Sequence, residues 1–175
     1  MKDIELRLVS ELMKNSRRSD RDLAKAIGVS QPTVSRLLKK LEKDGIIKEY
    51  TMIPDFRKLG FDLLALTFIK IQEPRSKEIE KITRTIENMK ENLPEVVMFE
   101  RGLGLGYHGV IVSFHEDYSS YVRFGKRIRD HCLLGISEIE GFLISLDAEA
   151  HYRPLTFATL AQHLLMLGKK TKDKP

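Results

Sequence analysis

Three residues at fixed spacing, Ala24, Gly28 and Val34, constrain the fold of this 175-residue chain more than any other feature. A small residue lets two helices cross closely, a glycine makes the turn between them, and a branched apolar residue packs the second helix onto the first. A helix-turn-helix depends on these three positions. The spacing therefore predicts a helix-turn-helix in the first third of the chain.

Apolar periodicity and capping residues place the helices around this turn. An apolar stripe predicts a helix over residues 3–14, and capping residues predict two more, over about 19–27 and 30–43. The segment IIKEYTMI, residues 46–53, has the composition of a strand or small wing. We therefore expect residues 1–53 to form a winged helix-turn-helix domain.

The third predicted helix has a positive, polar face opposite its apolar stripe. At its N-terminal end, where a recognition helix meets base edges, stand side chains able to donate or accept hydrogen bonds in a major groove: Gln31, Thr33, Ser35 and Arg36. Four cations are candidates for contacts to the DNA backbone: Lys39, Lys40, Lys48 and Arg21. The Arg36 guanidinium can bind either a guanine edge or a backbone phosphate, and the sequence does not distinguish these two contacts.

The distribution of charge agrees with a polyanionic partner. Residues 1–60 hold 14 Lys and Arg against 9 Asp and Glu, whereas residues 61–175 hold 16 against 16. All of the excess positive charge therefore lies in the first third of the chain. A basic module beside a neutral one indicates that the first part meets a polyanion and the second part has another role.

After Asp62 the pattern changes to strand, helix, strand, strand, helix, strand. This order is typical of the ferredoxin-like βαββαβ arrangement, so the predicted fold class is α+β. The expected strands are residues 63–72, 95–101, 110–115 and 139–146, and the expected helices are about 75–93 and 118–131.

The stretch GLGLGYHG, Gly102 to Gly109, contains a perfect G-x-G-x-x-G pattern. That pattern binds a dinucleotide only when a helix N-terminus follows it to receive the pyrophosphate. Here Gly109 is followed by VIVSFH, a run with the composition of a strand. The glycines therefore predict a hairpin loop and argue against a dinucleotide enzyme.

The segment from AIGVSQPTVSRLLKKLEKDGII through to FRKLGFD resembles the DNA-binding half and hinge strand of the leucine-responsive regulatory protein and AsnC family, the feast/famine transcription regulators. The resemblance covers about residues 1–147. It implies a sequence-specific regulator of transcription that binds double-stranded DNA, with a second domain that dimerises through its sheet. It also implies a small-molecule effector near the loop between the second and third strands.

The effector loop departs from the family pattern. Family members that bind amino acids usually show acidic residues after a glycine there, and GLGLGYHG has none. A carboxylate to pair with an ammonium group is therefore missing from the loop. The residues available to a ligand are Gly104, Gly106, Tyr107 and His108.

Physical reasoning also favours a dimer. Both faces of the first predicted strand are largely apolar, and two helices can cover only one face of an open sheet. The other face needs a partner. A two-fold dimer would present two recognition helices to half-sites about 34 Å apart, or a multiple of that, on a roughly palindromic operator.

A second class of function stays open at this stage. Some relatives of this architecture decarboxylate siroheme-type tetrapyrroles with His and Tyr residues, although no catalytic set is evident in this chain. The five histidines are scattered without the spacing of a zinc site, so we expect no metal and no cofactor. A single cysteine, Cys132, and an N-terminus without the apolar core of a signal peptide favour the cytoplasm.

The domain boundaries follow from these patterns. We expect a hinge over residues 54–62, a dimerisation and effector domain over 63–150, and a C-terminal helix with a basic tail over 151–175. The C-terminal helix is expected to end at Gly168 and to cover exposed sheet or extend an oligomer interface, with weak attraction to phosphate as the alternative.

Overall fold

The computed structural model describes residues 1–71, 84, 87–89, 91–131, 135–147 and 155–170. Contacts divide the chain into two compact units. The first unit comprises Met1–Ile53 and Arg153–Pro175, and the second comprises Pro54–Tyr152. The first unit is therefore discontinuous in sequence, because the chain leaves it once and returns to it.

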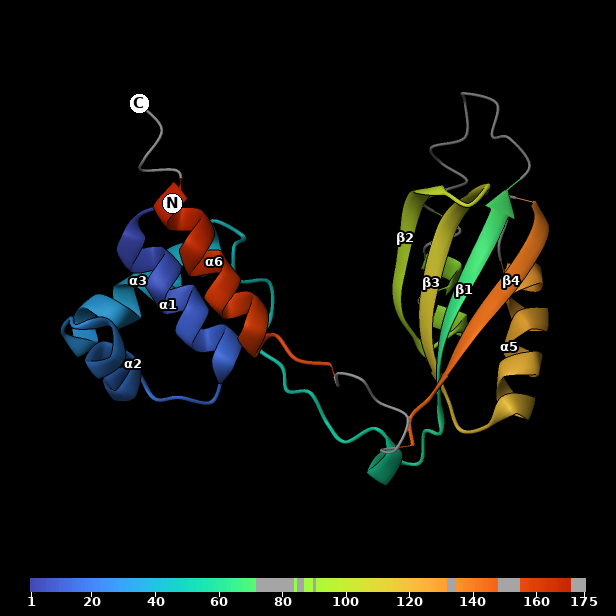
Figure 1. The fold of residues 1–175 in the computed structure, drawn as a ribbon, viewed down its shortest axis with the longest axis horizontal. Helices are drawn as coiled ribbons and strands as arrows, with labels where there is room; N and C mark the ends of the chain where they lie inside the picture. The colour runs from blue at the N-terminus through green and yellow to red at the C-terminus, as the bar shows by residue number, and fades with distance from the viewer. Residues whose placement is uncertain (72–83, 85–86, 90, 132–134, 148–154, 171–175) are drawn as a thin grey trace. The chain divides into compact units, whose positions relative to one another are not determined.

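The described part of the first unit is a bundle of helices (Figure 1). Its helices are α1 (Asp3–Lys14), α2 (Asp20–Ile27), α3 (Gln31–Lys43) and α6 (Ala158–Lys170). The predicted positions of the first three helices are confirmed. They enclose a core of fully or nearly buried side chains: Leu8, Leu23, Ala24, Ile27, Val34 and Leu41.

Local capping sets the ends of α2 and the start of α3. The Ser19 hydroxyl accepts a hydrogen bond from the backbone N–H of Asp22 at 3.2 Å. Gly28 ends α2 with φ at 75°, the left-handed conformation that a side chain would disfavour. Ser30 occupies the N-cap position of α3, but its hydroxyl bonds to the Thr33 hydroxyl at 2.9 Å and not to a backbone N–H.

The expected strand over residues 46–53 is not present: this described segment has no regular secondary structure. A strand requires a second extended segment to share its hydrogen bonds. Side chains hold the segment in place instead. The Tyr50 hydroxyl donates to Glu42 at 2.8 Å, and the Ser16 hydroxyl donates to the Thr51 carbonyl at 2.9 Å.

The second unit is built on a four-stranded antiparallel sheet in the order β2-β3-β1-β4 (Figure 1). The strands are β1 (Leu63–Ile71), β2 (Val96–Gly104), β3 (Tyr107–His115) and β4 (Ile136–Ser145), with α5 (Tyr118–His131) between the last two. Residues 84, 87–89, 91 and 92 are helical, and the rest of the helix expected over 75–93 lies outside the described residues. The ferredoxin-like order predicted from the sequence is confirmed.

The glycine stretch forms the tight hairpin between β2 and β3, as predicted. Leu105 and Gly106 are the two turn residues, with φ of 54° and 80°. Positive φ at both central residues is the geometry that matches the right-handed twist of the flanking strands. The strands reach further into the glycine stretch than expected, since Gly104 pairs with Tyr107.

One face of the sheet packs on α5. Ile69 of β1 and Ile111 of β3 are fully buried with Phe124 and Ile128 of α5. The opposite face is also apolar, because Leu66 pairs with Val112 on one side and with Phe142 on the other. Phe142 is 61% exposed.

The segment expected to be a hinge is attached to the second unit. Phe56 stacks on Phe114 of β3 with ring centroids 4.0 Å apart. Arg57, in a short 3-10 helix (Arg57–Leu59), forms an ion pair with Asp147. Asp62 donates its backbone N–H to the His115 carbonyl at 3.0 Å.

The C-terminal helix lies against α1 in the first unit (Figure 1). The Ser10 hydroxyl donates to the Ala161 carbonyl at 3.0 Å, and both residues are fully buried. The helix also continues through Gly168 to Lys170. Two small residues, Ser10 and Ala161, let α1 and α6 approach closely. The expected role of this helix as a cover for the sheet or as part of an oligomer interface stays a prediction.

Candidate nucleic-acid interface

The packing of α3 on the core decides which of its side chains reach solvent. Val34 and Leu41 are fully buried, and Leu37 and Leu38 pack partly against the same core. The exposed residues of α3 are largely polar or basic, with one proline and one acid among them: Gln31, Pro32, Arg36, Lys39, Lys40, Glu42 and Lys43. The predicted orientation of the helix is confirmed.

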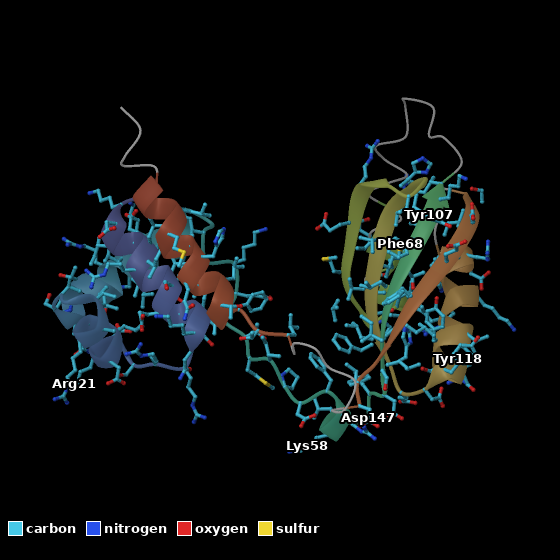
Figure 2. All side chains as sticks on the ribbon, viewed as in Figure 1. Arg21, Lys58, Phe68, Tyr107, Tyr118 and Asp147 are labelled. Atoms are coloured by element: carbon cyan, nitrogen blue, oxygen red, sulfur yellow. The ribbon has the colours of Figure 1, made fainter. Side chains whose placement is uncertain are left out.

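Two further cations predicted for this surface are also exposed. Arg21 is in the first turn of α2, and Figure 2 shows its side chain extending outward from that helix. Lys48 is in the irregular segment after α3. The structure therefore brings α3, the start of α2 and this segment into one unit with their cations in solvent.

Ser35 is held within the fold. Its hydroxyl donates to the Asp20 carboxylate at the start of α2, and it also lies 3.3 Å from the Gln31 carbonyl. Its side chain is half-buried. These contacts join the two helices of the motif, so Ser35 has a positioning role that the sequence pattern did not reveal.

Lys40 joins α3 to α1. Its ammonium lies 2.5 Å from a carboxylate oxygen of Glu5, whose side chain is only 3% exposed. The hydrogen bond from Lys40 lowers the pKa of the Glu5 carboxyl, with a smaller contribution from the backbone N–H of Lys2. The same bond raises the pKa of the Lys40 ammonium.

Glu5 holds Lys40 in place, a positioning contact that sequence reasoning missed. It is the third residue of α1, and its second carboxylate oxygen accepts the Lys2 backbone N–H at 2.7 Å. An acidic residue in a first turn is normally a solvated one that favours the helix dipole. No local signal distinguishes a buried carboxylate whose cation lies 35 residues away.

The predicted effector residues lie at and beside the β2–β3 hairpin. The Tyr107 hydroxyl donates to Glu138 of β4 at 3.2 Å, and its ring centroid lies 5.8 Å from that of Phe68 (Figure 2). Burial, with hydrogen bonds to the Glu140 and Glu138 carboxylates, raises the pKa of Tyr107 to about 12. His108 accepts the backbone N–H of Ile71 at 3.1 Å through Nδ1.

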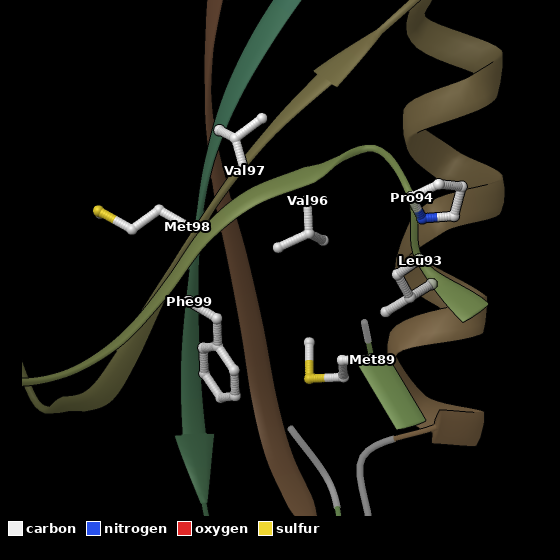
Figure 3. Close-up of a pocket in the computed structure, with 7 residues that line it drawn as sticks. All are labelled: Met89, Leu93, Pro94, Val96, Val97, Met98 and Phe99. Carbon is white, nitrogen blue, oxygen red and sulfur yellow. The ribbon is translucent and has the colours of Figure 1, made fainter. Parts of the chain in front are cut away.

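A pocket of about 250 Å³ opens beside β2 (Figure 3). Its lining is apolar: Met89, Leu93, Pro94, Val96, Val97, Met98 and Phe99. None of these described lining residues is an acid, a base or a nucleophile. Within the described ranges, no group of three or more His, Cys, Asp or Glu residues is arranged to hold a metal ion, and no helix could cross a membrane.

Comparison with known proteins identifies the family. Residues 1–48 match the model of the winged helix-turn-helix DNA-binding family. An HTH-type transcriptional regulator of Pyrococcus furiosus is 35% identical over 125 residues, 70% of this chain and 76% of its own length. LrpC of Bacillus subtilis is 32% identical over 87 residues, 50% of this chain and 60% of its own length. The chain belongs to the Lrp/AsnC family.

Solved structures of Lrp/AsnC proteins share the fold. The AsnC family regulator of Agrobacterium tumefaciens has a TM-score of 0.73 at 24% identity, and the alignment covers 89% of this chain and 94% of that one. B. subtilis LrpC has a TM-score of 0.67 at 22% identity, covering 87% and 99%. Several curated relatives match over only about half of their own length, as with a second P. furiosus regulator that is 38% identical over 80 residues, 46% of this chain and 54% of its own length.

Proposed function

We propose that this protein is a sequence-specific, DNA-binding regulator of transcription and not an enzyme. The observation that carries the proposal is the exposed face of α3, where Gln31, Arg36 and Lys39 project from a helix whose other side is buried. A helix so presented can enter a major groove, where Arg and Gln read base edges and Lys contacts phosphate. The named relatives are transcription regulators, and the tetrapyrrole alternative gains no support from them.

The proposed contacts divide by chemistry. Gln31, Thr33 and Arg36 stand in the first turns of α3 and are assigned to bases. Lys39, Lys48 and Arg21 are assigned to backbone phosphates. Ser35 and Lys40 remain candidates for bases and phosphate respectively, although each already has an intramolecular carboxylate partner.

Selection of bound sequences from a random DNA pool tests the proposal. Arg36→Ala should weaken binding to the selected site by about 1 to 3 kcal/mol and relax preference at one base. Lys126→Ala, which removes an exposed cation from α5 in the second unit, is the matched control and should leave binding unchanged. Absence of any enriched sequence would sink the proposal.

We also propose that the protein acts as a dimer through the sheet face opposite α5. Leu66, Phe68 and Val112 line that face, and the exposed Phe142 extends it. An apolar face of this kind is typical of a protein interface. Phe142→Asp should convert the dimer to monomer in sedimentation and weaken operator binding. A dimer of undiminished stability in that variant would reject this interface.

The proposed effector site is the β2–β3 hairpin with β4. The hairpin lacks an acid, but Glu138 and Glu140 supply carboxylates beside the Tyr107 hydroxyl. A ligand with an amino group could replace the Tyr107 hydrogen bond there. Repeating the DNA selection with amino acid mixtures tests this, with Tyr107→Phe and Glu138→Gln expected to abolish any response. An unchanged response in both variants would exclude the site.

A further inference from the structure

The segment that contains α6 carries two adjacent apolar stripes, each with alternating spacings of three and four residues. The first stripe is Ala158, Ala161, Leu165 and Gly168, and the second is Phe157, Leu160, Leu164 and Leu167. One such stripe is enough to pack a helix against one neighbour. A second stripe beside it indicates a second neighbour.

The first stripe already has its neighbour. Ala161 is fully buried, and its carbonyl accepts the Ser10 hydroxyl of α1 at 3.0 Å. Small residues at this position let the two helix backbones approach closely. This contact accounts for one side of α6 only.

The second stripe is about half exposed. Phe157 is 47% exposed and Leu160 is 50% exposed, while Leu164 is half-buried. Leu167, at the fourth position, is 48% exposed. Large apolar residues at heptad spacing on an accessible helix surface are the pattern of a helix-helix seam.

Charge indicates what covers this seam. From Leu155 to Gly168 the chain has no Asp, Glu, Lys or Arg, although 31% of all its residues are charged. Two copies of this surface can therefore meet without placing like charges together, and an acidic or basic partner would find no complement on it. An uncharged apolar surface can therefore meet a copy of itself across a two-fold axis, as an isologous contact requires.

We propose that the α6 segment pairs with the same segment of a second copy of this chain through Leu160 and Leu164 of α6 and through Phe157, which directly precedes the helix. A helix pair of this length buries less than the roughly 1,200–2,000 Å² of a stable interface. The contact therefore acts together with the proposed sheet-face dimer and holds two first units next to each other. It is separate from the α3 surface and does not require DNA.

Disulfide capture in the full-length chain tests the pairing. In a Cys132→Ala background, Leu160→Cys and Leu164→Cys are oxidised alone and as a mixture, so that parallel and antiparallel pairing are both detected. At least one should give a covalent dimer. Gln162→Cys, exposed on the other side of the same helix, is the matched control and should not. No excess of covalent dimer over this control would overturn the proposal.

A second variant separates this contact from the sheet-face dimer. Leu160→Gln should weaken self-association at least about tenfold while the melting temperature stays unchanged, since the side chain is already half exposed. Unchanged association would count against the α6 contact. Phe142→Asp, measured in parallel, reports the sheet face alone, so failure of one interface is distinguishable from failure of the other.

Discussion

The Lys40 ammonium lies 2.5 Å from the buried carboxylate of Glu5, and this contact fixes α3 against α1. Lys39, the preceding residue, has an exposed side chain on the same helix. Adjacent lysines on the predicted DNA-binding helix therefore have different environments. This difference leads to a comparison that separates contact with phosphate from positioning of the helix.

The salt dependence of DNA binding should distinguish the two lysines. Each phosphate contact contributes about 0.9 to the slope of log K against log salt. We expect Lys39→Gln to reduce the slope by about one such contact and Lys40→Gln to reduce it less, because Glu5 already binds that ammonium. Lys40→Gln should instead lower the melting temperature. If Lys39→Gln and Lys40→Gln reduced the slope equally, the Lys40 ammonium would have to separate from Glu5 and contact a phosphate when DNA binds.

Removal of α6 should destabilise the first unit. Deletion of residues 155–175 exposes the surface of α1 around Ser10, which is now fully buried against Ala161. We expect a lower melting temperature and weaker DNA binding, because α3 shares its core with α1. Deletion of residues 171–175 alone is the control and should change neither. An unaltered melting curve for the longer deletion would contradict the packing.

Relief of the backbone strain at Leu105, in the turn between β2 and β3, should stabilise the second unit. Leu105 is 84% exposed and has φ at 54°, a conformation that costs most side chains about 1–2 kcal/mol. Asn tolerates it better and is the preferred residue before Gly in such a turn. Leu105→Asn should therefore raise the free energy of unfolding by about 0.5–1 kcal/mol in urea titration. Leu105→Ala, which keeps a β-carbon without the local hydrogen bond, should give no such gain.

His115 is a buried histidine in the second unit. It bonds to Ser113 at 2.8 Å through Nε2, and its ring centroid lies 4.9 Å from that of Phe124. Burial lowers the pKa of His115 below its ordinary 6.5; the nearby Glu95 opposes this shift and Arg127 adds to it. The folded protein therefore favours the neutral imidazole.

This histidine should make stability depend on pH. Below pH 6.5 His115 is protonated in the unfolded chain but stays neutral in the folded chain until the pH reaches its lower folded-state pKa. The free energy of unfolding should therefore be greatest above that pH and decline as the pH falls toward the lower pKa of the folded state. Urea titrations across the range test this, with His115→Gln expected to give a flatter profile. The same slope in that variant would assign the dependence to other groups.

The sequence by itself determined the features that depend on near neighbours. Gly28 had to end α2 because only glycine takes φ of 75° without strain. The turn at Leu105 and Gly106 followed from glycines between two strand-like runs. The buried side of α3 followed from residues three and four apart, since helical periodicity brings them to one face.

Only the tertiary structure decided the contacts between distant residues. Glu5 meets Lys40 across 35 residues, and Ser10 meets Ala161 across 151. Residues 46–53, after α3, do not form the strand that their composition predicted, because a strand requires a second extended segment to share its hydrogen bonds. Local propensity is set by a residue and its neighbours within a turn or two, whereas the partner of a buried carboxylate or a small helix residue is chosen by how whole elements pack.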